Sequence, residues 1–482
     1  MQPSSRRRTA SVSSVRIRQR QTLGFPESLY TRRYLRGWRV TMAGPYVPHY
    51  VGDAVDKKLR SRLGWLTAGV ATSIPWPPSD VWVTYDGDDF ILRGSKRNEQ
   101  PSPPGITIAC DRDNVDDALA KVYRFTSILG WYKCGFVDVS GYTYGSHPML
   151  YGDPRNVYSS TGTMSAKSFN CNHMPIVRDE RARKALGFYR EGSRLRHVHD
   201  NYSFLSFHKV IESQFANGRT KGQWINANLD NLTDDRAVAR IAELRASGLN
   251  VGDHLFESGR CAVAHASLHG EIVDPDIPAD RRRISSDLCV MEALARYYVG
   301  RELQIENDRE TYANRNRLAP WRGLMEAASL AQLEAGEVPE TVDQLDGHQV
   351  SLGLWPDGPI PGLEAMTMRV EAIGAGAVRV VLLNERLTIV LPFVLDFRHG
   401  RAHTQLEEGG LCHTPQNRPD EADVRAYSTY FYNVLGNGIA ELQIANLQPV
   451  DCEVVIPVNI VPPIPQQAIE EQVERFRQQG AA

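Results

Sequence analysis

The spacing of apolar residues changes twice along this chain, and that change is the strongest constraint on its fold. Short alternating runs mixed with Pro and Gly occupy residues 42–178, apolar residues at helical spacing fill residues 179–340, and alternation returns over residues 345–465. Alternation favours half-buried strands, whereas helical spacing favours amphipathic helices. The sequence therefore predicts a multidomain α+β protein with an N-terminal α/β region, a central all-α bundle and a C-terminal antiparallel β-rich domain.

The N-terminal region combines strand and helix patterns. Residues 80–94 alternate around the turn-forming letters DGDD, which predicts a hairpin. Residues 113–131 open with an Asp/Asn cap and continue at helical spacing, which predicts a helix. The polar stretch 141–178 is predicted to connect this region to the next.

The central region, residues 179–340, is predicted to contain about five or six helices with short connections. The stretch 201–215 carries its large side chains at helical spacing: Phe204, Leu205, His208, Ile211 and Phe215. Residues 345–465 contain β-rich runs separated by Gly, Asn and Pro, which predict a sandwich-like or barrel domain. One helix over 420–436 and a terminal helix over 466–482 accompany it.

The first 41 residues form a basic arm. They contain ten arginines and one acid, Glu27, so the rest of the chain has 45 basic and 56 acidic residues, a difference of −11. This composition predicts a disordered tail, or an upstream extension if translation starts at Met42. A nucleic-acid-binding arm and a transit peptide are the alternatives.

The remaining composition argues against several classes of protein. No run approaches the roughly 18–20 apolar residues of a membrane span. The seven cysteines are scattered without a C-x-x-C pair, which is typical of reduced thiols in a cytoplasmic protein. Because phosphate-binding and dinucleotide-binding glycine motifs are missing, no cofactor is expected. His399, His403, Cys412 and His413 are interpreted as loop histidines and a loop thiol, so no metal site is predicted.

The stretch ESGRCAVAHASL, residues 257–268, contains an arginine and a histidine separated by four residues, Arg260 and His265. This R-x4-H pattern resembles the signature of the HEPN (higher eukaryotes and prokaryotes nucleotide-binding) superfamily, whose domains are small helical bundles. The motif follows an aromatic-rich helix that contains the acid Glu212, and this order of elements also resembles that family. Cys261 departs from the Asn, Asp or His that is commonest after the arginine.

The resemblance implies metal-independent RNA cleavage, in which a 2′-hydroxyl attacks the neighbouring phosphate. It implies that His265 is the base or acid, since its pKa lies near neutrality, and that Arg260 clamps the phosphate. Glu212, Glu257 and Tyr202 are the predicted supporting residues. A simpler interpretation is that Glu257 and Arg260 form an i, i+3 ion pair and that Tyr202 is a core residue.

Several basic residues are predicted to contact the RNA backbone: Arg281, Arg282, Arg283 and Lys209. The basic stretch 181–197, which contains aromatic residues, is a further candidate. Solvated helix faces are the alternative for all of them.

The geometry of a straight helix separates Arg260 and His265 by about 140°, so they do not share a face. Either the helix ends near Ala266, or a second copy of the motif completes the site. HEPN ribonucleases use the second arrangement, and the resemblance therefore implies a homodimer. Ala262, Ala264 and Ala266 would let two such helices approach closely.

A broader resemblance covers most of the chain, in stretches such as YSFLSFHKVIE, VSLGLWPDGPIPGLEAMTM and LPFVLDFRHGRAHT. These stretches look like proteins of the methylamine utilization protein MauJ family. Two functions are therefore expected as alternatives. One is a regulatory or defence-related RNA endonuclease, and the other is a non-catalytic accessory or binding protein that dimerises through the bundle.

Overall fold

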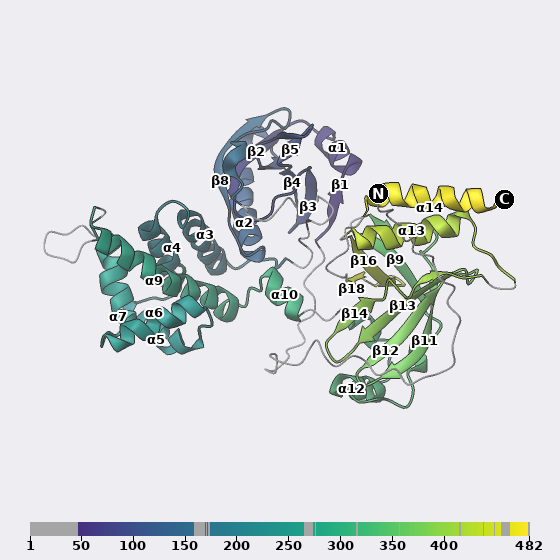
Figure 1. Cartoon of the computed structure of the whole chain (residues 1–482). Coiled ribbons are helices and arrows are strands. Elements are labelled where there is room, and N and C mark those ends of the chain that lie inside the picture. The colour runs from purple at the N-terminus through teal and green to yellow at the C-terminus, as the bar shows by residue number, and fades with distance from the viewer. Residues whose placement is uncertain are drawn as a thin grey trace, which may run out of the picture. The chain divides into compact units, whose positions relative to one another are not determined.

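The computed structural model contains the three predicted regions (Figure 1). It describes residues 47–158, 169, 171, 174–264, 273–274, 276–314, 317–355, 357–413, 416–436, 438–447, 449–454 and 463–480. The basic arm and His265 lie outside these residues. The predicted fold class, a mixed α/β region, a helical region and an antiparallel β region, is confirmed.

The N-terminal region is a six-stranded antiparallel sheet in the order β1-β3-β4-β7-β2-β8. Its strands are β1 (His49–Val51), β2 (Trp65–Thr72), β3 (Val81–Tyr85), β4 (Asp88–Arg93), β7 (Gly105–Ala109) and β8 (Val137–Gly145). The predicted hairpin is β3 and β4. Asp86 and Gly87 at its tip have φ values of 49° and 85°, and two positive φ values are what a type I′ hairpin turn requires.

Helix α2 (Val115–Tyr132) packs against this sheet, where the sequence predicts it. Asp116 and Asp117 lie in its first turn, where their carboxylates interact favourably with the positive end of the helix dipole. Phe125 stacks on Phe90 of β4 with ring centroids 4.1 Å apart and an interplanar angle of 5°. This aromatic pair joins the helix to the sheet.

The central region consists of helices with short connections. Its main helices are α3 (Glu180–Leu195), α4 (Asp200–Glu212), α5 (Gly218–Asn228), α6 (Asp235–Ala246), α7 (Val251–His254), α8 (Ala262–Ala264) and α9 (Pro278–Tyr297). Asp179, Asn217 and Asp234 cap α3, α5 and α6 by accepting hydrogen bonds from backbone N–H groups of the first turn. Two segments have π-helical geometry instead, η4 (Leu255–Cys261) and η5 (Tyr298–Glu302).

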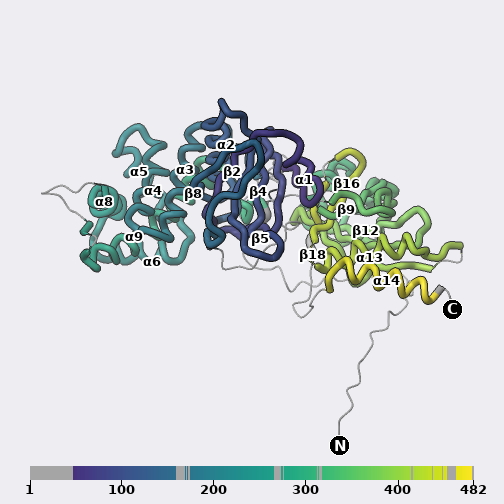
Figure 2. The backbone as a smooth tube through the Cα atoms, turned by 90° about the horizontal axis from the view of Figure 1, so that it is seen from above, coloured from purple at the N-terminus to yellow at the C-terminus, as the bar shows by residue number. Residues whose placement is uncertain are grey.

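The N-terminal and central regions share one continuous apolar core. Helix α3 lies beside α2 and β8 (Figures 1 and 2). Trp131 at the end of α2 donates its indole N–H to the carbonyl of Ile305 at 3.1 Å, and Arg190 of α3 lies 3.1 Å from Asp138 of β8. The first contact joins α2 to the segment after η5, and the second joins α3 to the sheet.

The C-terminal region is a ten-stranded sheet whose main path is β17-β16-β9-β11-β12-β13-β14-β18. Its longer strands are β9 (Gln349–Trp355), β11 (Met366–Gly374), β12 (Ala377–Leu383), β13 (Ile389–Asp396) and β16 (Ile439–Ile444). The shorter ones are β10 (Gly358–Pro359), β14 (Arg401–Thr404), β15 (Gly410–Leu411), β17 (Val450–Asp451) and β18 (Glu453–Val454). These described strands pair antiparallel, apart from β14 with β18.

Two of the helices of this region lie where the sequence predicts them, α13 (Glu421–Leu435) and α14 (Pro465–Gly480), and they pack on each other. Asp420 and Asp423 form a capping box that begins α13. The predicted bundle extends to residue 340, but the side chains of α11 (Ala319–Arg322) and α12 (Ala327–Ala335) contribute to the C-terminal core. Their apolar side chains pack into this core because burial there removes them from water.

Within the described part of the chain, none of the helices combines the length and the apolar character needed to cross a membrane.

Two glycines in the helical region should respond to Ala in opposite ways. A Cβ at Gly259 of η4 would lie 2.5 Å from Cζ of Phe204, which is fully buried, whereas a Cβ at Gly187 inside α3 would meet no atom within 4 Å. We expect Gly259→Ala to lower the free energy of unfolding by about 1–3 kcal/mol through overpacking. Gly187→Ala should raise it by about 0.5–1 kcal/mol because Ala is the better helix former. Urea denaturation of the full chain measures both; equal effects of the two substitutions would contradict the packing described for Phe204.

Candidate functional site

The segment that carries Arg260 is a π-helix rather than the straight α-helix that the sequence predicts. Segment η4 runs from Leu255 to Cys261 and continues into α8. A π-helix bonds each N–H to the fifth residue before it, and such segments are frequent at functional sites. Gly259 lets the backbone of η4 approach the ring of Phe204 on α4, so the segment lies close against that helix.

Four ionisable side chains from three elements meet where η4 crosses α4. Glu212, at the end of α4, accepts a hydrogen bond from Lys221 of α5 with Nζ and Oε1 3.1 Å apart. Arg260 Nη2 lies 3.5 Å from the same oxygen. His208, one turn before Glu212, has Nδ1 3.7 Å from Glu212 Oε2. We call these four residues the Glu212 cluster.

The cluster is buried on one side and open on the other. The side chains of His208 and Lys221 are 0% and 4% exposed, whereas those of Glu212 and Arg260 are 33% and 25% exposed. The ring of Phe256 covers Lys221, with Nζ 4.7 Å from the centroid. Glu212 therefore joins an interior lysine to a partly accessible arginine.

The surroundings shift two pKa values in the cluster. Contacts with His208 and Lys221 lower the pKa of Glu212 to about 2, although its partial burial opposes this shift. Burial lowers the pKa of His208, because the charged imidazole would lose its hydration, and the cations Lys221 and Arg260 act in the same direction. At neutral pH the cluster thus contains one carboxylate, a neutral imidazole and two cations.

Glu212 and Arg260 were both predicted as site residues, and the structure brings them together. Of the other predicted supporting residues, Glu257 lies on the same segment as Arg260, and Tyr202 lies apart. Glu257 is exposed on η4, and Tyr202 is 55% exposed near the start of α4, where its ring contacts His199. Ten residues of helix separate Tyr202 from Glu212, which corresponds to about 15 Å. Because Tyr202 is 55% exposed, the interpretation of this residue as a core residue is wrong.

The predicted RNA-contacting residues occupy different surroundings. Arg281 and Arg282 are exposed in the first turns of α9. Arg283 instead donates to the backbone carbonyl of Ser258, so it supports η4. Lys209 lies over the ring of Phe188 with Nζ 5.7 Å from the centroid. Of these four, Arg281 and Arg282 are the ones that present open cationic side chains.

A second buried ionic group holds the start of η4, and the sequence analysis missed it. Asp287 of α9 is fully buried and lies 2.9 Å from both Arg240 of α6 and Nε2 of His254. Because His254 directly precedes η4, this carboxylate ties the π-helical segment to two helices of the bundle. The sequence DRRRISSD, residues 280–287, does not indicate that Asp287 is buried, because its burial depends on how the helices pack.

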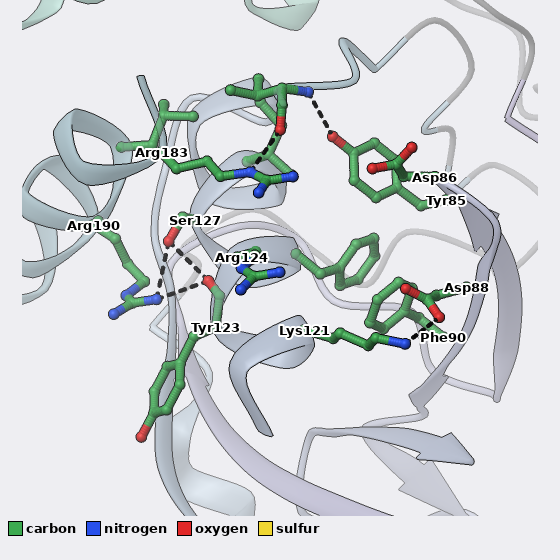
Figure 3. Close-up of a pocket in the computed structure, with 15 residues that line it drawn as sticks. Tyr85, Asp86, Asp88, Phe90, Lys121, Tyr123, Arg124, Ser127, Arg183 and Arg190 are labelled. Atoms are coloured by element: carbon green, nitrogen blue, oxygen red, sulfur yellow. Dashed lines mark hydrogen bonds and ion pairs between the residues drawn. The ribbon is translucent and has the colours of Figure 1, made fainter. Parts of the chain in front are cut away.

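A cation-lined pocket of about 230 Å³ lies between the sheet and helices α2 and α3 (Figure 3). Phe90, Phe125, Ile128 and Leu186 supply its apolar surface, and Lys121, Arg124, Arg183 and Arg190 its cations. Most of these cations already have partners. Lys121 donates to Asp88 at 2.8 Å, Arg190 to Ser127 at 2.9 Å and Arg183 to the carbonyl of Val177 at 2.9 Å. These contacts join α2 to β4, α3 to α2 and α3 to the segment before it, so we rank this pocket below the Glu212 cluster as a functional site.

The described residues contain no group of three or more His, Cys, Asp or Glu side chains placed to hold a metal ion. His399, one of the loop histidines, bonds Asp396 through Nδ1 at 2.8 Å. The Glu212 cluster offers one carboxylate against two cations, which suits an anion better than a metal ion.

Comparison with known proteins finds one similarity, in the central region of the chain. Residues 185–299 match the model of the family described as Methylamine utilization protein MauJ. The matched segment runs from within α3 to within η5 and includes the whole Glu212 cluster. No curated protein and no solved structure matches the chain.

The acid sensitivity of the cluster can be tested by Glu212→Gln. The substitution leaves Lys221 buried without its carboxylate, so we expect the free energy of unfolding to fall by about 1–2 kcal/mol at pH 7, discounted for the partial exposure of Glu212. Since the pKa of Glu212 is depressed to about 2 in the folded protein, its stabilisation is present above pH 4.5 and is lost as the pH falls towards 2. The difference between wild type and variant should shrink over that window. Denaturation at several pH values measures it, and a difference that stays constant down to pH 2 would contradict the ion pairing.

Proposed function

We propose that the helical region is a HEPN-type, metal-independent RNA endonuclease domain in which Arg260 binds the scissile phosphate. The observation that carries this proposal is the geometry of Arg260. Its guanidinium is held 3.5 Å from Glu212, while a quarter of the side chain remains accessible. A fixed, planar, permanently charged donor fork suits the charge that develops on a phosphorane.

In this mechanism His265 supplies the proton transfer. As a base it takes the proton of the 2′-hydroxyl, whose oxygen then attacks the adjacent phosphorus, and the imidazolium so formed returns a proton to the departing 5′-oxygen. The products are a 2′,3′-cyclic phosphate and a 5′-hydroxyl end, and no metal is needed. His265 follows α8 directly in the sequence, at a position outside the described residues, and its role rests on the R-x4-H resemblance.

Two further parts of the proposal concern binding. Arg281 and Arg282, exposed on α9, would contact the RNA backbone through their charge. By the R-x4-H resemblance, a homodimer would bring two such segments across one cleft. The partly exposed Val263 and exposed Ala264 of α8 offer small side chains for such an approach.

The alternative function is a non-catalytic accessory protein, and the match of residues 185–299 to the MauJ family model favours it. In this alternative the Glu212 cluster is a structural element. Glu212 would serve to neutralise Lys221 and Arg260 within the bundle, and RNA would not be cleaved.

RNA cleavage without metal separates the two functions. Purified full-length protein incubated with single-stranded RNA and EDTA should yield fragments that end in cyclic phosphate, detected by mass spectrometry. Arg260→Ala and His265→Ala should each slow cleavage by at least about 100-fold, because each removes a group that acts on the transition state.

Arg245→Ala is the matched control, since Arg245 is an exposed arginine of α6 that pairs with Asp230. It should cleave like wild type, and circular dichroism should show that all variants are folded. If wild type leaves RNAs of varied sequence intact, or if Arg260→Ala cleaves as fast as wild type, the nuclease proposal fails and the accessory function stands.

A further inference from the structure

A second cavity, of about 420 Å³, lies on the other flank of α3 between the N-terminal and central regions. Its size falls in the range of small-molecule sites, about 300–1,000 Å³. Residues far apart in the sequence line it: Ser73, Cys134, Gly135, Phe136, Tyr189, Ser193, Arg196, His197, Glu292 and Arg296. The Glu212 cluster shares no residue with it.

Two arginines in this cavity share a single carboxylate. Glu292 of α9 is 9% exposed and forms ion pairs with Arg196, just after α3, and with Arg296, one turn further along α9. The Arg196 and Arg296 side chains remain 32% and 48% exposed. One carboxylate cannot neutralise two guanidiniums, so the cavity wall has a net positive charge and donors available to a ligand.

Aromatic rings flank these arginines. Arg194 lies between Phe136 and Tyr158, with its guanidinium carbon 5.4 Å and 5.0 Å from the two ring centroids. His197 lies 5.2 Å from the ring of Phe136. Tyr158 is 44% exposed, and its ring centroid lies 5.9 Å from that of His197, which lines the cavity. Arginine forks next to open aromatic faces are the combination that binds a phosphate together with a nucleobase.

We propose that this cavity is a nucleotide-binding site in which Arg196 and Arg296 hold the phosphate and the partly exposed ring of Tyr158, supported from behind by the buried Phe136, stacks on the base. The Ser193 hydroxyl lines the same cavity and adds a donor for the phosphate. Burial and the neighbouring Arg194 and Arg196 lower the pKa of His197. The site is independent of RNA cleavage at Arg260.

Glu292 provides a test of the proposal, because its carboxylate competes with the ligand for both arginines. Isothermal titration of the full chain with AMP measures the affinity, with inorganic phosphate and adenosine as probes for the two halves of the ligand. Glu292→Gln should bind AMP about tenfold more tightly, since it removes the internal anion and keeps the side-chain shape. Arg196→Gln and Arg296→Gln should each bind about tenfold more weakly. Tyr158→Ala should weaken AMP binding and leave phosphate binding unchanged.

A purely structural ion pair predicts a different pattern. Glu292→Gln would then lower the melting temperature without raising the affinity for AMP. Arg245→Gln is the control, and it should bind AMP as wild type does. An RNA 5-mer with and without a 5′-phosphate distinguishes a chain end from a free nucleotide as the source of the phosphate. The proposal is overturned if AMP and phosphate fail to bind at millimolar concentration, or if the Glu292 and arginine variants bind them like wild type.

Discussion

The ion pair between Glu212 and Lys221 is the interaction on which the arrangement of the candidate site depends. Lys221 is almost wholly buried, so its charge requires the carboxylate 3.1 Å away. The need for this ion pair fixes the end of α4 against α5. The same carboxylate then holds Arg260 of η4 in place. The position of Arg260 is thus a consequence of a charge that the bundle must neutralise for its own stability.

Helix α3 has a comparable role for the two cavities. It lies between the N-terminal sheet and the bundle within a single apolar core, and its successive turns face different surroundings. Arg183 and Arg190 line the cavity beside α2, where they bond backbone and side-chain oxygens of neighbouring segments. Arg196 follows the last turn and meets Glu292 of α9. A helix that is basic along its length therefore stabilises one junction and lines a more open cavity at the next.

The fold class follows from the sequence because the period of the apolar residues follows directly from strand and helix geometry. The proximity of Glu212 and Arg260 could also be anticipated, since family resemblance places both at one site. The burial of Lys221 could not be anticipated, because the surrounding sequence, GRTKGQW, is typical of a solvated lysine. Its burial depends on contacts with Phe256 and α4. The π-helical form of η4 has no composition signal either; it depends on how Gly259 packs on Phe204. Asp287 and Glu292 were missed for the same reason, since each meets its partners only when separate helices pack.

The Glu212 cluster and the cavity at Glu292 have the same electrostatic design. In each, one partly or largely buried carboxylate is shared by two permanent cations, Lys221 with Arg260 and Arg196 with Arg296. Such a triad holds its cations in place; in the Glu292 cavity two guanidiniums face one carboxylate, a charge imbalance that costs free energy in proportion to burial. An anion that enters beside the more exposed cation restores the balance and recovers that energy. In both places the exposed cation is an arginine, whose fork can bond the internal carboxylate and an incoming phosphate at the same time. The proposals for Arg260 and for the Glu292 cavity thus share one chemical basis, an arginine that an internal carboxylate holds in place and that can also bond a phosphate.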